Sequence, residues 1–182
     1  DNVGLKSLNI NWLRSQIGYV PQNPFLFSES ISENIKFGKI NSNLEEVKNA
    51  SEKANVNIDI ESFSKKYDTI IGERGLTLSG GQIQRISIAR AIIRNPKILL
   101  LDDCLSSVDI KTEKEIIKNL KKIRNHKTTI IVSHRISSIK HCDKIIVLKK
   151  GKIIEQGNHK SLKKNNGYYH KLLNKQNTEN SI

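Results

Sequence analysis

The sequence predicts an α/β fold in which helices flank a parallel core sheet, with a helical subdomain at about residues 28–95. From residue 97 onward, short apolar runs alternate with segments of helical periodicity, as is typical of parallel strands joined by helices. The run Ile98–Leu101 is continuously apolar, as strands buried on both faces of a sheet are. Between residues 28 and 95 helical periodicity dominates, which indicates the subdomain.

Before residue 97 we expect one strand and four helices. The strand is Ile17–Val20, which Pro21 ends. The clearest helix is Leu44–Asn55, where apolar residues recur at helical spacing, acids come early and lysines come late. The other helices are expected over Ser30–Phe37, which Gly38 stops, over Ile58–Lys66, and over residues 80–94, after a glycine-rich loop at 72–81.

The second half should extend the sheet and end in a hairpin and two helices. A second buried strand, Thr128–Val132, lies between helices at Lys111–Ile123 and Ile136–His141. Gly151 marks the turn of a hairpin formed by Lys144–Leu148 and Lys152–Gln156. Two short helices follow, His159–Lys164 and Tyr168–Asn174, and the residues from Lys175 should form a polar, disordered tail.

Length and composition predict one domain at residues 1–175, with a polar tail at 176–182. No apolar run approaches the ~20 residues that a membrane-spanning helix needs. The two cysteines, Cys104 and Cys142, are far apart and lack CxxC spacing, which argues against a zinc site or a disulfide framework and fits a reducing cytosol. Because the chain begins with Asp1 instead of Met, we expect a fragment or an excised domain.

The chain is strongly basic, with a formal net charge of +13 and an isoelectric point near 9.8. Such a balance is found in proteins that bind nucleic acid or acidic membranes, and also on lysine-rich solvated surfaces. The lysines are dispersed, and no basic run is interleaved with aromatic residues that could stack on bases. We interpret the charge as a solvated face and expect no nucleic-acid partner, with anionic lipid headgroups as the alternative.

The most specific motif is a glycine-containing run at a helix start. It consists of Leu78, Ser79, Gly80, Gly81 and Gln82. Glycines let a phosphate approach the backbone closely, and the free N–H groups and positive end of a helix attract an anion. Taken alone, the run fits either a simple turn before a helix or a helix start that binds phosphate.

Polar side chains also follow the expected strands. Asp102 ends the apolar run, at the edge of a parallel sheet where ligands bind in this architecture, and Asp103 comes next. Gln22 follows the first strand by two residues, and His134 follows Val132 by two. Each of these residues alone would indicate little, and their order and spacing give them weight.

Together, these residues resemble the ATP-binding domain of ABC transporters of the exporter type. The run Leu78–Gln82 is similar to the family's signature sequence, and Ile98–Asp102 is similar to its Walker B motif. The segment Ile17–Gln22 resembles the Q-loop, Ser106–Asp109 the D-loop, and Gly72–Gly75 the X-loop of exporters. The resemblance covers residues 8–173 and implies a partial P-loop NTPase (ABC ATPase) fold.

The resemblance also implies a role for each position. Asp102 and Gln22 would hold Mg²⁺, Gln22 would also reach the nucleophilic water, and His134 would contact the γ-phosphate of ATP. Asp103 stands where the family has the base that activates water. The signature residues, with Ser106 and Asp109 of the D-loop, would act on a nucleotide shared with a partner.

ATP and Mg²⁺ are the implied cofactors, and two partners are implied with them. One is a second ABC ATP-binding domain, paired head to tail in a homodimer or heterodimer. The other is the transmembrane domain of an exporter, which residues 23–27 and 30–37 would face. This arrangement would place the chain at the cytoplasmic face of the cell membrane.

The first departure from the family pattern is the absence of a Walker A loop, G-x-x-x-x-G-K-S/T. Neither Gly38–Lys39 nor Gly151–Lys152 is followed by Ser or Thr. In the family this loop precedes the Q-loop, so we expect it upstream of Asp1. We expect the 182 residues alone to be a poorly stable, inactive truncation.

The second departure is Asp103, where the family usually has Glu. Aspartate is one methylene shorter, which withdraws its carboxylate by roughly 1 Å, and a displacement of that size can slow catalysis ~100-fold. We therefore expect Asp103 to be a weak base. The chain then resembles the degenerate-site subunit of a heterodimeric multidrug or lipid exporter.

Two alternative functions stay open. The first is a soluble ABC ATPase acting on nucleic acid, which the basic charge favours and which the X-loop-like residues disfavour. The second is an inactive truncated product that only pairs with an intact partner, which the missing Walker A loop favours.

Overall fold

The structure is a computed structural model that describes residues 3–72 and 78–179. The chain divides into two compact units, Asp1–Val132 and Ser133–Ile182. The single domain at 1–175 expected from the sequence stays a prediction.

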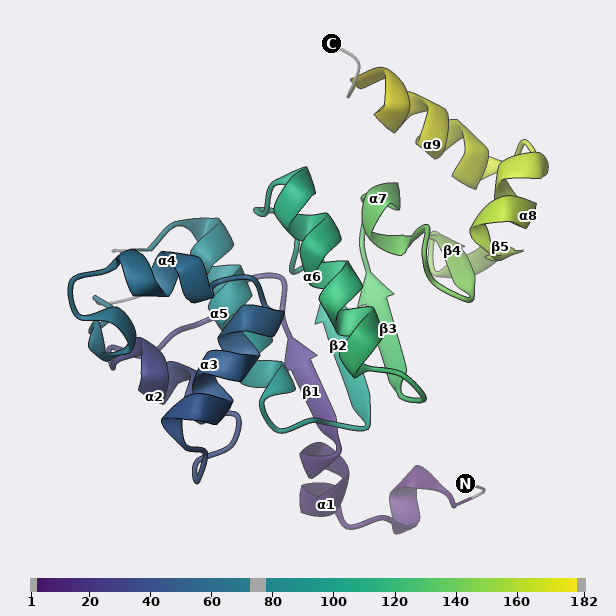
Figure 1. The fold of residues 1–182 in the computed structure, drawn as a ribbon. Helices are drawn as coiled ribbons and strands as arrows, with labels where there is room; N and C mark the ends of the chain where they lie inside the picture. Colours follow the sequence, from purple (N-terminus) through teal and green to yellow (C-terminus); the bar gives the residue numbers. More distant parts are fainter. Residues whose placement is uncertain (1–2, 73–77, 180–182) are drawn as a thin grey trace. The chain divides into compact units, whose positions relative to one another are not determined.

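The first unit is built on a parallel sheet of three strands in the order β1-β2-β3 (Figure 1). These are β1 (Ile17–Val20), β2 (Ile98–Asp102) and β3 (Thr128–Val132), which confirms the strands expected from the sequence. Ile17 pairs with Ile98, and Ile98 pairs with Thr128. Because all three strands run in one direction, the residues that follow them start from the same edge of the sheet.

Burial of the sheet is one-sided, so the two-sided burial expected of its apolar strands is wrong. Leu99 and Leu101 are buried in one hydrophobic cluster with residues of α5 (Gly80–Ile92) and α6 (Ile110–Ile123). Ile130 and Val132, on the edge strand, are 50% and 57% exposed. Side chains alternate between the faces of a strand, so covering one face buries only every second residue.

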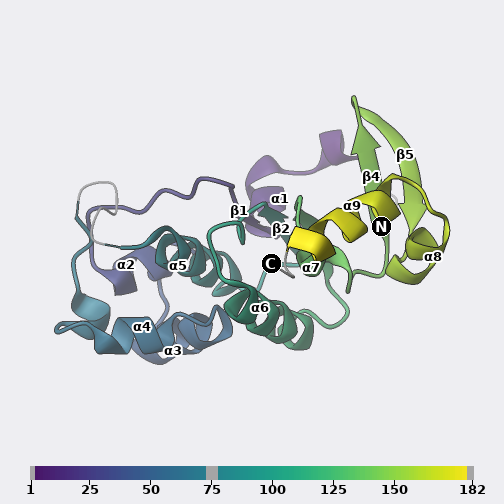
Figure 2. The same ribbon diagram turned by 90° about the horizontal axis from the view of Figure 1, so that it is seen from above.

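Between β1 and β2, the described residues form four α-helices. They are α2 (Ile31–Lys36), α3 (Leu44–Lys53), α4 (Asn57–Ser62) and α5, and a 3₁₀ turn, η2 (Lys66–Asp68), follows α4. Helices α2 and α3 pack alongside α5 (Figure 2). The single helix expected over Ile58–Lys66 is wrong, because Phe63 adopts an extended backbone with φ −75° and ψ 146° and ends α4.

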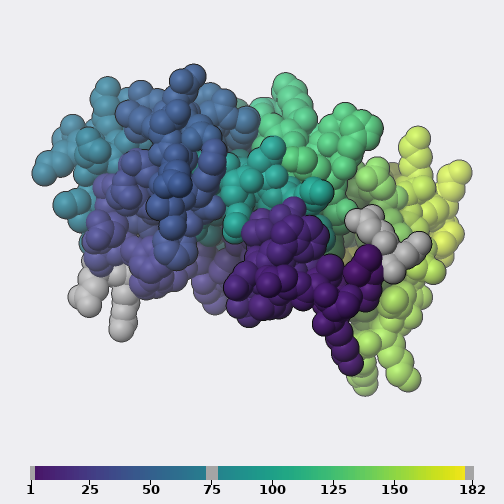
Figure 3. Space-filling model, turned by 90° about the horizontal axis from the view of Figure 1, so that it is seen from below, coloured from purple at the N-terminus to yellow at the C-terminus, as the bar shows by residue number. Residues whose placement is uncertain are grey.

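Two N-terminal elements were not expected from the sequence. They are η1 (Leu5–Ser7) and α1 (Ile10–Ser15), which lie at the surface (Figure 3). The Asn9 side chain caps α1 by accepting hydrogen bonds from the backbone N–H groups of Asn11 and Trp12. An asparagine at such a position is a recognised helix start, so this signal was present in the sequence.

Arg90 joins α5 to two other segments of the first unit. Its Nε and Nη2 donate to the backbone and side-chain oxygens of Asn34 at 2.9 and 2.8 Å, and its Nη1 donates to the Phe25 carbonyl at 2.8 Å. The rings of Phe27 and Phe37 lie against the guanidinium. Burial lowers the pKa of Arg90 to about 10, which leaves the side chain charged at neutral pH.

The second unit contains a hairpin and three helices. They are α7 (Ile136–Ile139), β4 (Ile145–Lys149), β5 (Lys152–Gly157), α8 (His159–Lys164) and α9 (Tyr168–Glu179). Lys150 and Gly151 both have positive φ, as a tight hairpin turn requires. The core of the unit consists of Ile136, Ile145, Leu162 and Tyr169.

The disordered tail expected from Lys175 is wrong as far as Glu179, because α9 continues to that residue. The Gln176 side chain explains part of this order. Its Oε1 accepts a hydrogen bond from the Ile136 N–H at 2.9 Å, and its Nε2 donates to the His134 carbonyl at 2.7 Å. The polar composition of the segment gave no sign of these contacts, so the sequence predicted disorder.

Arg90→Lys should lower the free energy of unfolding by about 2 kcal/mol or more, because lysine cannot satisfy three acceptors in the fork geometry of arginine. Chemical denaturation of the purified chain measures this change. Arg94→Lys is the matched control, since Arg94 is exposed just beyond the same helix. Equal stability of the two variants would contradict the role given to Arg90.

Candidate functional site

The start of α5 is closed by a capping box. The Ser79 hydroxyl accepts from the Gln82 N–H at 3.2 Å, and the Gln82 Oε1 accepts from the Ser79 N–H at 3.0 Å. The first turn contains no acidic residue, so no carboxylate within it offsets the positive end of the helix. The run Leu78–Gln82 therefore presents a helix end suited to an anion.

The D-loop-like segment lies against this helix start. The Gln84 Oε1 accepts from the Ser107 N–H at 3.0 Å, and its Nε2 donates to the Ser106 hydroxyl at 3.3 Å. A Cβ added to Gly81 would lie 3.0 Å from the Ser107 carbonyl oxygen, tighter than most real contacts. Glycine at position 81 thus permits the close approach of the two segments.

Asp109, at the end of that segment, caps α6. Its Oδ1 accepts from the N–H groups of Lys111 and Thr112, each at 3.0 Å. The hydrogen bonds from Thr112 are the main cause of a lowered pKa for this exposed carboxyl. In this chain Asp109 therefore has a structural role as the N-cap of α6.

The residues after β1 and β2 meet at the carboxyl edge of the sheet. The Gln22 Nε2 donates to Asp103 Oδ2 at 3.4 Å, and the Tyr19 hydroxyl donates to Asp102 Oδ2 at 3.4 Å. The Asp103 N–H donates to the Val132 carbonyl at 2.8 Å. The structure therefore brings Gln22, Asp102 and Asp103 together, and it adds Tyr19, which the sequence did not single out.

Asp103 has an unusual backbone conformation, with φ +45°. Asp and Asn tolerate this left-handed region better than most residues, because their short polar side chains bond locally. The neighbouring Cys104 is buried, and burial raises the pKa of its thiol to about 12. Cys104 thus stays protonated at neutral pH and is a packing residue.

His134 and the X-loop-like segment are the two other sequence-predicted positions. His134 belongs to the second unit, where its carbonyl accepts the hydrogen bond from Gln176. Of the X-loop-like residues Gly72–Gly75, Glu73, Arg74 and Gly75 lie outside the described residues.

Sequence reasoning missed Asp59, which contacts the signature run from α4. Asp59 Oδ1 accepts from Gln82 Nε2 at 2.9 Å, and both carboxylate oxygens accept from Arg85. Burial alone would raise the pKa of Asp59, but the hydrogen bonds from Arg85 and Gln82 and the charge of Arg85 outweigh it, so this pKa is lowered. No local pattern marks Asp59, since it precedes Gln82 by 23 residues.

The residues at the carboxyl end of the sheet are suited to a magnesium ion that takes most of its ligands from water and phosphate oxygens. Asp102 would offer a carboxylate oxygen and Gln22 an amide oxygen, and Mg²⁺ usually takes one or two such protein ligands besides water and phosphate oxygens. Over the described ranges, no three His, Cys, Asp or Glu side chains gather as a metal site. Over the same ranges, no helix has both the length and the apolar character needed to cross a bilayer.

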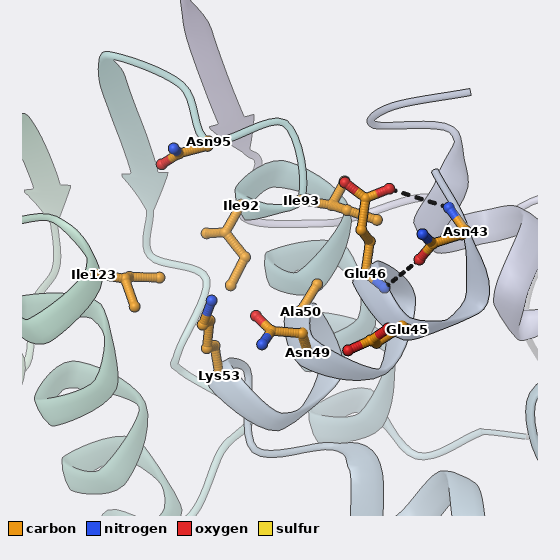
Figure 4. A pocket seen from close by; sticks show the side chains of 10 residues that line it. All are labelled: Asn43, Glu45, Glu46, Asn49, Ala50, Lys53, Ile92, Ile93, Asn95 and Ile123. Carbon is orange, nitrogen blue, oxygen red and sulfur yellow. Dashed lines mark hydrogen bonds between the residues drawn. The ribbon is translucent and has the colours of Figure 1, made fainter. Parts of the chain in front are cut away.

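A pocket of about 430 Å³ lies at the opposite end of α5 from the signature run (Figure 4). Ile92 and Ile93 contribute its apolar wall, and Asn43 and Glu46 of the α3 capping box contribute its polar rim. Since α5 rises ~1.5 Å per residue, the pocket is roughly 18 Å from Gly80. It is separate from every motif described above.

Comparison with known proteins places the chain in a family. Residues 1–106 of 182 match the ABC transporter family. ABC transporter B family member 2 of Dictyostelium discoideum is 46% identical over 97% of this chain and 13% of its own length. ATP-binding cassette sub-family B member 5 of Homo sapiens is 48% identical over 98% of this chain and 14% of its own length.

Bacterial relatives cover the chain equally well. The probable multidrug resistance ABC transporter ATP-binding/permease protein YheI of Bacillus subtilis (strain 168) is 46% identical over 96% of this chain and 30% of its own length. A solved structure of a bacterial Atm1-family ABC exporter with ATP bound has a TM-score of 0.93 and 38% identity, over 97% of this chain and 31% of that one. The chain therefore spans less than a third of these relatives, and it belongs to the ABC transporter family.

Proposed function

We propose that this chain is part of the ATP-hydrolysing domain of an exporter, in which ATP bound between two such domains drives transport across a membrane. The observation that carries the proposal is the signature run at the capped, positive start of α5. The 38% identity to an ATP-bound exporter over 97% of the chain supports it.

At one nucleotide, α5 would act on ATP held by a second domain, paired head to tail. The Ser79 hydroxyl and the N–H groups of Gly80 and Gly81 are the donors that face an incoming γ-phosphate in this proposal. Donors fixed before the reaction stabilise the charge that spreads over the phosphoryl oxygens in the transition state. Ser106 and Asp109 would lie across the same interface.

At the other nucleotide, the residues at the carboxyl end of the parallel sheet would bind Mg²⁺ and the phosphates. Mg²⁺, when bound, neutralises phosphate charge. Asp102 and Gln22 are its proposed ligands, Asp103 is the proposed base, and His134 is the proposed contact of the γ-phosphate. This site also needs a Walker A loop, which the 182 residues do not contain.

The two sites are proposed to differ in activity. Asp103 carries a shorter side chain than the glutamate usual in the family. This shorter reach favours a weak base at this chain's own site. The proposed assembly is therefore a heterodimer with one degenerate site and one competent site, which this chain's signature completes.

A transmembrane domain is the second proposed partner, at the cytoplasmic face of the membrane. Phe25 and Phe37 lie in the segments expected to face it and are 58% and 61% exposed. Arg90 connects both segments to α5 through its contacts with Phe25 and Phe37. A movement of α5 would therefore move these two segments. A multidrug or lipid substrate is part of the proposal.

Ser79→Ala should lower vanadate-sensitive ATPase activity of the full-length gene product, assembled with its partner in liposomes, by about tenfold or more. The variant removes a phosphate donor that is worth roughly 10²-fold at comparable sites. Asn43→Ala is the matched control, because Asn43 and Glu46 form the same kind of capping box on α3. Equal losses of activity in both variants would mean that Ser79 acts only as a helix cap and not as a phosphate donor.

Asp103→Glu should raise hydrolysis at this chain's own site by about 10- to 100-fold, because the carboxylate regains its reach. Single-turnover hydrolysis in the same assembly measures it, and a melting curve records any strain from the positive φ at this residue. Asp143→Glu, at an exposed position, is the control. An unchanged rate in Asp103→Glu rules out the weak-base explanation.

A further inference from the structure

We propose that Asp59 is a positioning residue for the signature run: through Gln82 and Arg85, its carboxylate fixes the first turn of α5 for the nucleotide of the partner domain. This inference rests on the proposed function of the signature, and it adds a residue from a different helix to that site.

The first link is the Gln82 side-chain amide, which is engaged at both ends. Its Oε1 accepts from the Ser79 N–H at 3.0 Å, while its Nε2 donates to Asp59 Oδ1 at 2.9 Å. An amide held by an acceptor on one side and a donor on the other has a single orientation. Loss of the Asp59 acceptor would free the amide to turn and would weaken the cap on Ser79.

The second link is Arg85, one turn further along α5. Its Nη1 and Nη2 donate to Asp59 Oδ2 and Oδ1 at 2.7 and 3.2 Å, a two-pronged ion pair. Its Nε donates to the Gly81 carbonyl at 3.2 Å. The guanidinium thus connects Asp59 directly to the backbone of the second signature glycine, and its side chain is only 13% exposed.

The pairing also controls where a phosphate can bind. Arg85 carries a full positive charge close to the positive end of α5. While Asp59 neutralises that charge, the backbone N–H groups and the Ser79 hydroxyl are the strongest donors at the helix start. Without Asp59, the guanidinium would keep its hydrogen bonds to the Gly81 and Asn55 carbonyls but would be freed of its counter-ion. Its unpaired charge would then compete for the phosphate and draw it away from the geometry that serves the reaction.

Loss of Asp59 should affect nucleotide binding and catalysis differently. A freed Arg85 keeps or strengthens attraction for the nucleotide in the ground state, whereas a misplaced phosphate lowers the rate of the chemical step. Asp59→Asn is therefore expected to lower kcat about tenfold, with a KM for ATP that is unchanged or lower. A merely destabilised domain would not show this split.

The experiment uses the full-length gene product with its partner in liposomes. Steady-state ATPase rates are divided by the amount of protein reconstituted in the liposomes, and a melting curve checks that each variant is folded. Glu61→Gln is the matched control, since Glu61 lies on the same helix and its pair with Lys66 is exposed. It should keep kcat and KM within about twofold of the wild type.

Two further variants complete the test. Asp59→Glu keeps the carboxylate and should recover most of kcat. Arg85→Lys cannot bind both oxygens of Asp59 and should show the same loss of kcat without a rise in KM, which also serves if Asp59→Asn does not fold. Wild-type kcat in Asp59→Asn or in Arg85→Lys would overturn the proposal, and so would a loss in Asp59→Asn that is confined to KM.

Ser79→Ala in the same preparation separates this inference from the function on which it rests. A loss of activity in Ser79→Ala with none in Asp59→Asn overturns the role of Asp59 alone. No loss in Ser79→Ala, or no ATPase activity in the wild type, overturns the proposed function and the role of Asp59 with it.

Discussion

The fixed position of helix α5 is the constraint on which the rest of the first unit depends. Its buried residues Ile86, Ile88 and Ala89 pack in the main hydrophobic cluster. Near its start, Arg85 is paired with Asp59, and near its end, Arg90 is held by Asn34 and the Phe25 carbonyl. A guanidinium that donates to several acceptors is held rigidly. The two arginines therefore fix the positions of both ends of α5 against the neighbouring segments.

This arrangement connects two surfaces through one helix. The signature run lies at the start of α5, and the segment after the Q-loop-like residues is bound to its end through Arg90. The D-loop-like residues pack on the same helix start through Gln84 and the close approach of Gly81 to Ser107. In the proposed function, a rigid helix between a nucleotide and a membrane domain would transmit movement from one to the other.

Local patterns in the sequence predicted the strands and the residues that follow them. The apolar run before Asp102, and the glycines before the α5 helix, are short signals that needed no tertiary information. The contacts of Asp59, Tyr19 and Gln84 could not be predicted in this way, because only folding brings these residues to their partners. The order of α9 beyond Lys175 was missed for the same reason, since Gln176 is fixed by contacts with distant residues.

The central claim is that this chain's signature acts on a nucleotide held by another domain, and photolabelling tests it most directly. ATP with a photoreactive group on the γ-phosphate is cross-linked to the assembled full-length product, and labelled tryptic peptides are identified. The account predicts label on the peptide of residues 75–85, which contains the signature, only when the partner domain is present. Equal labelling of this peptide without the partner, or none with it, would contradict the account.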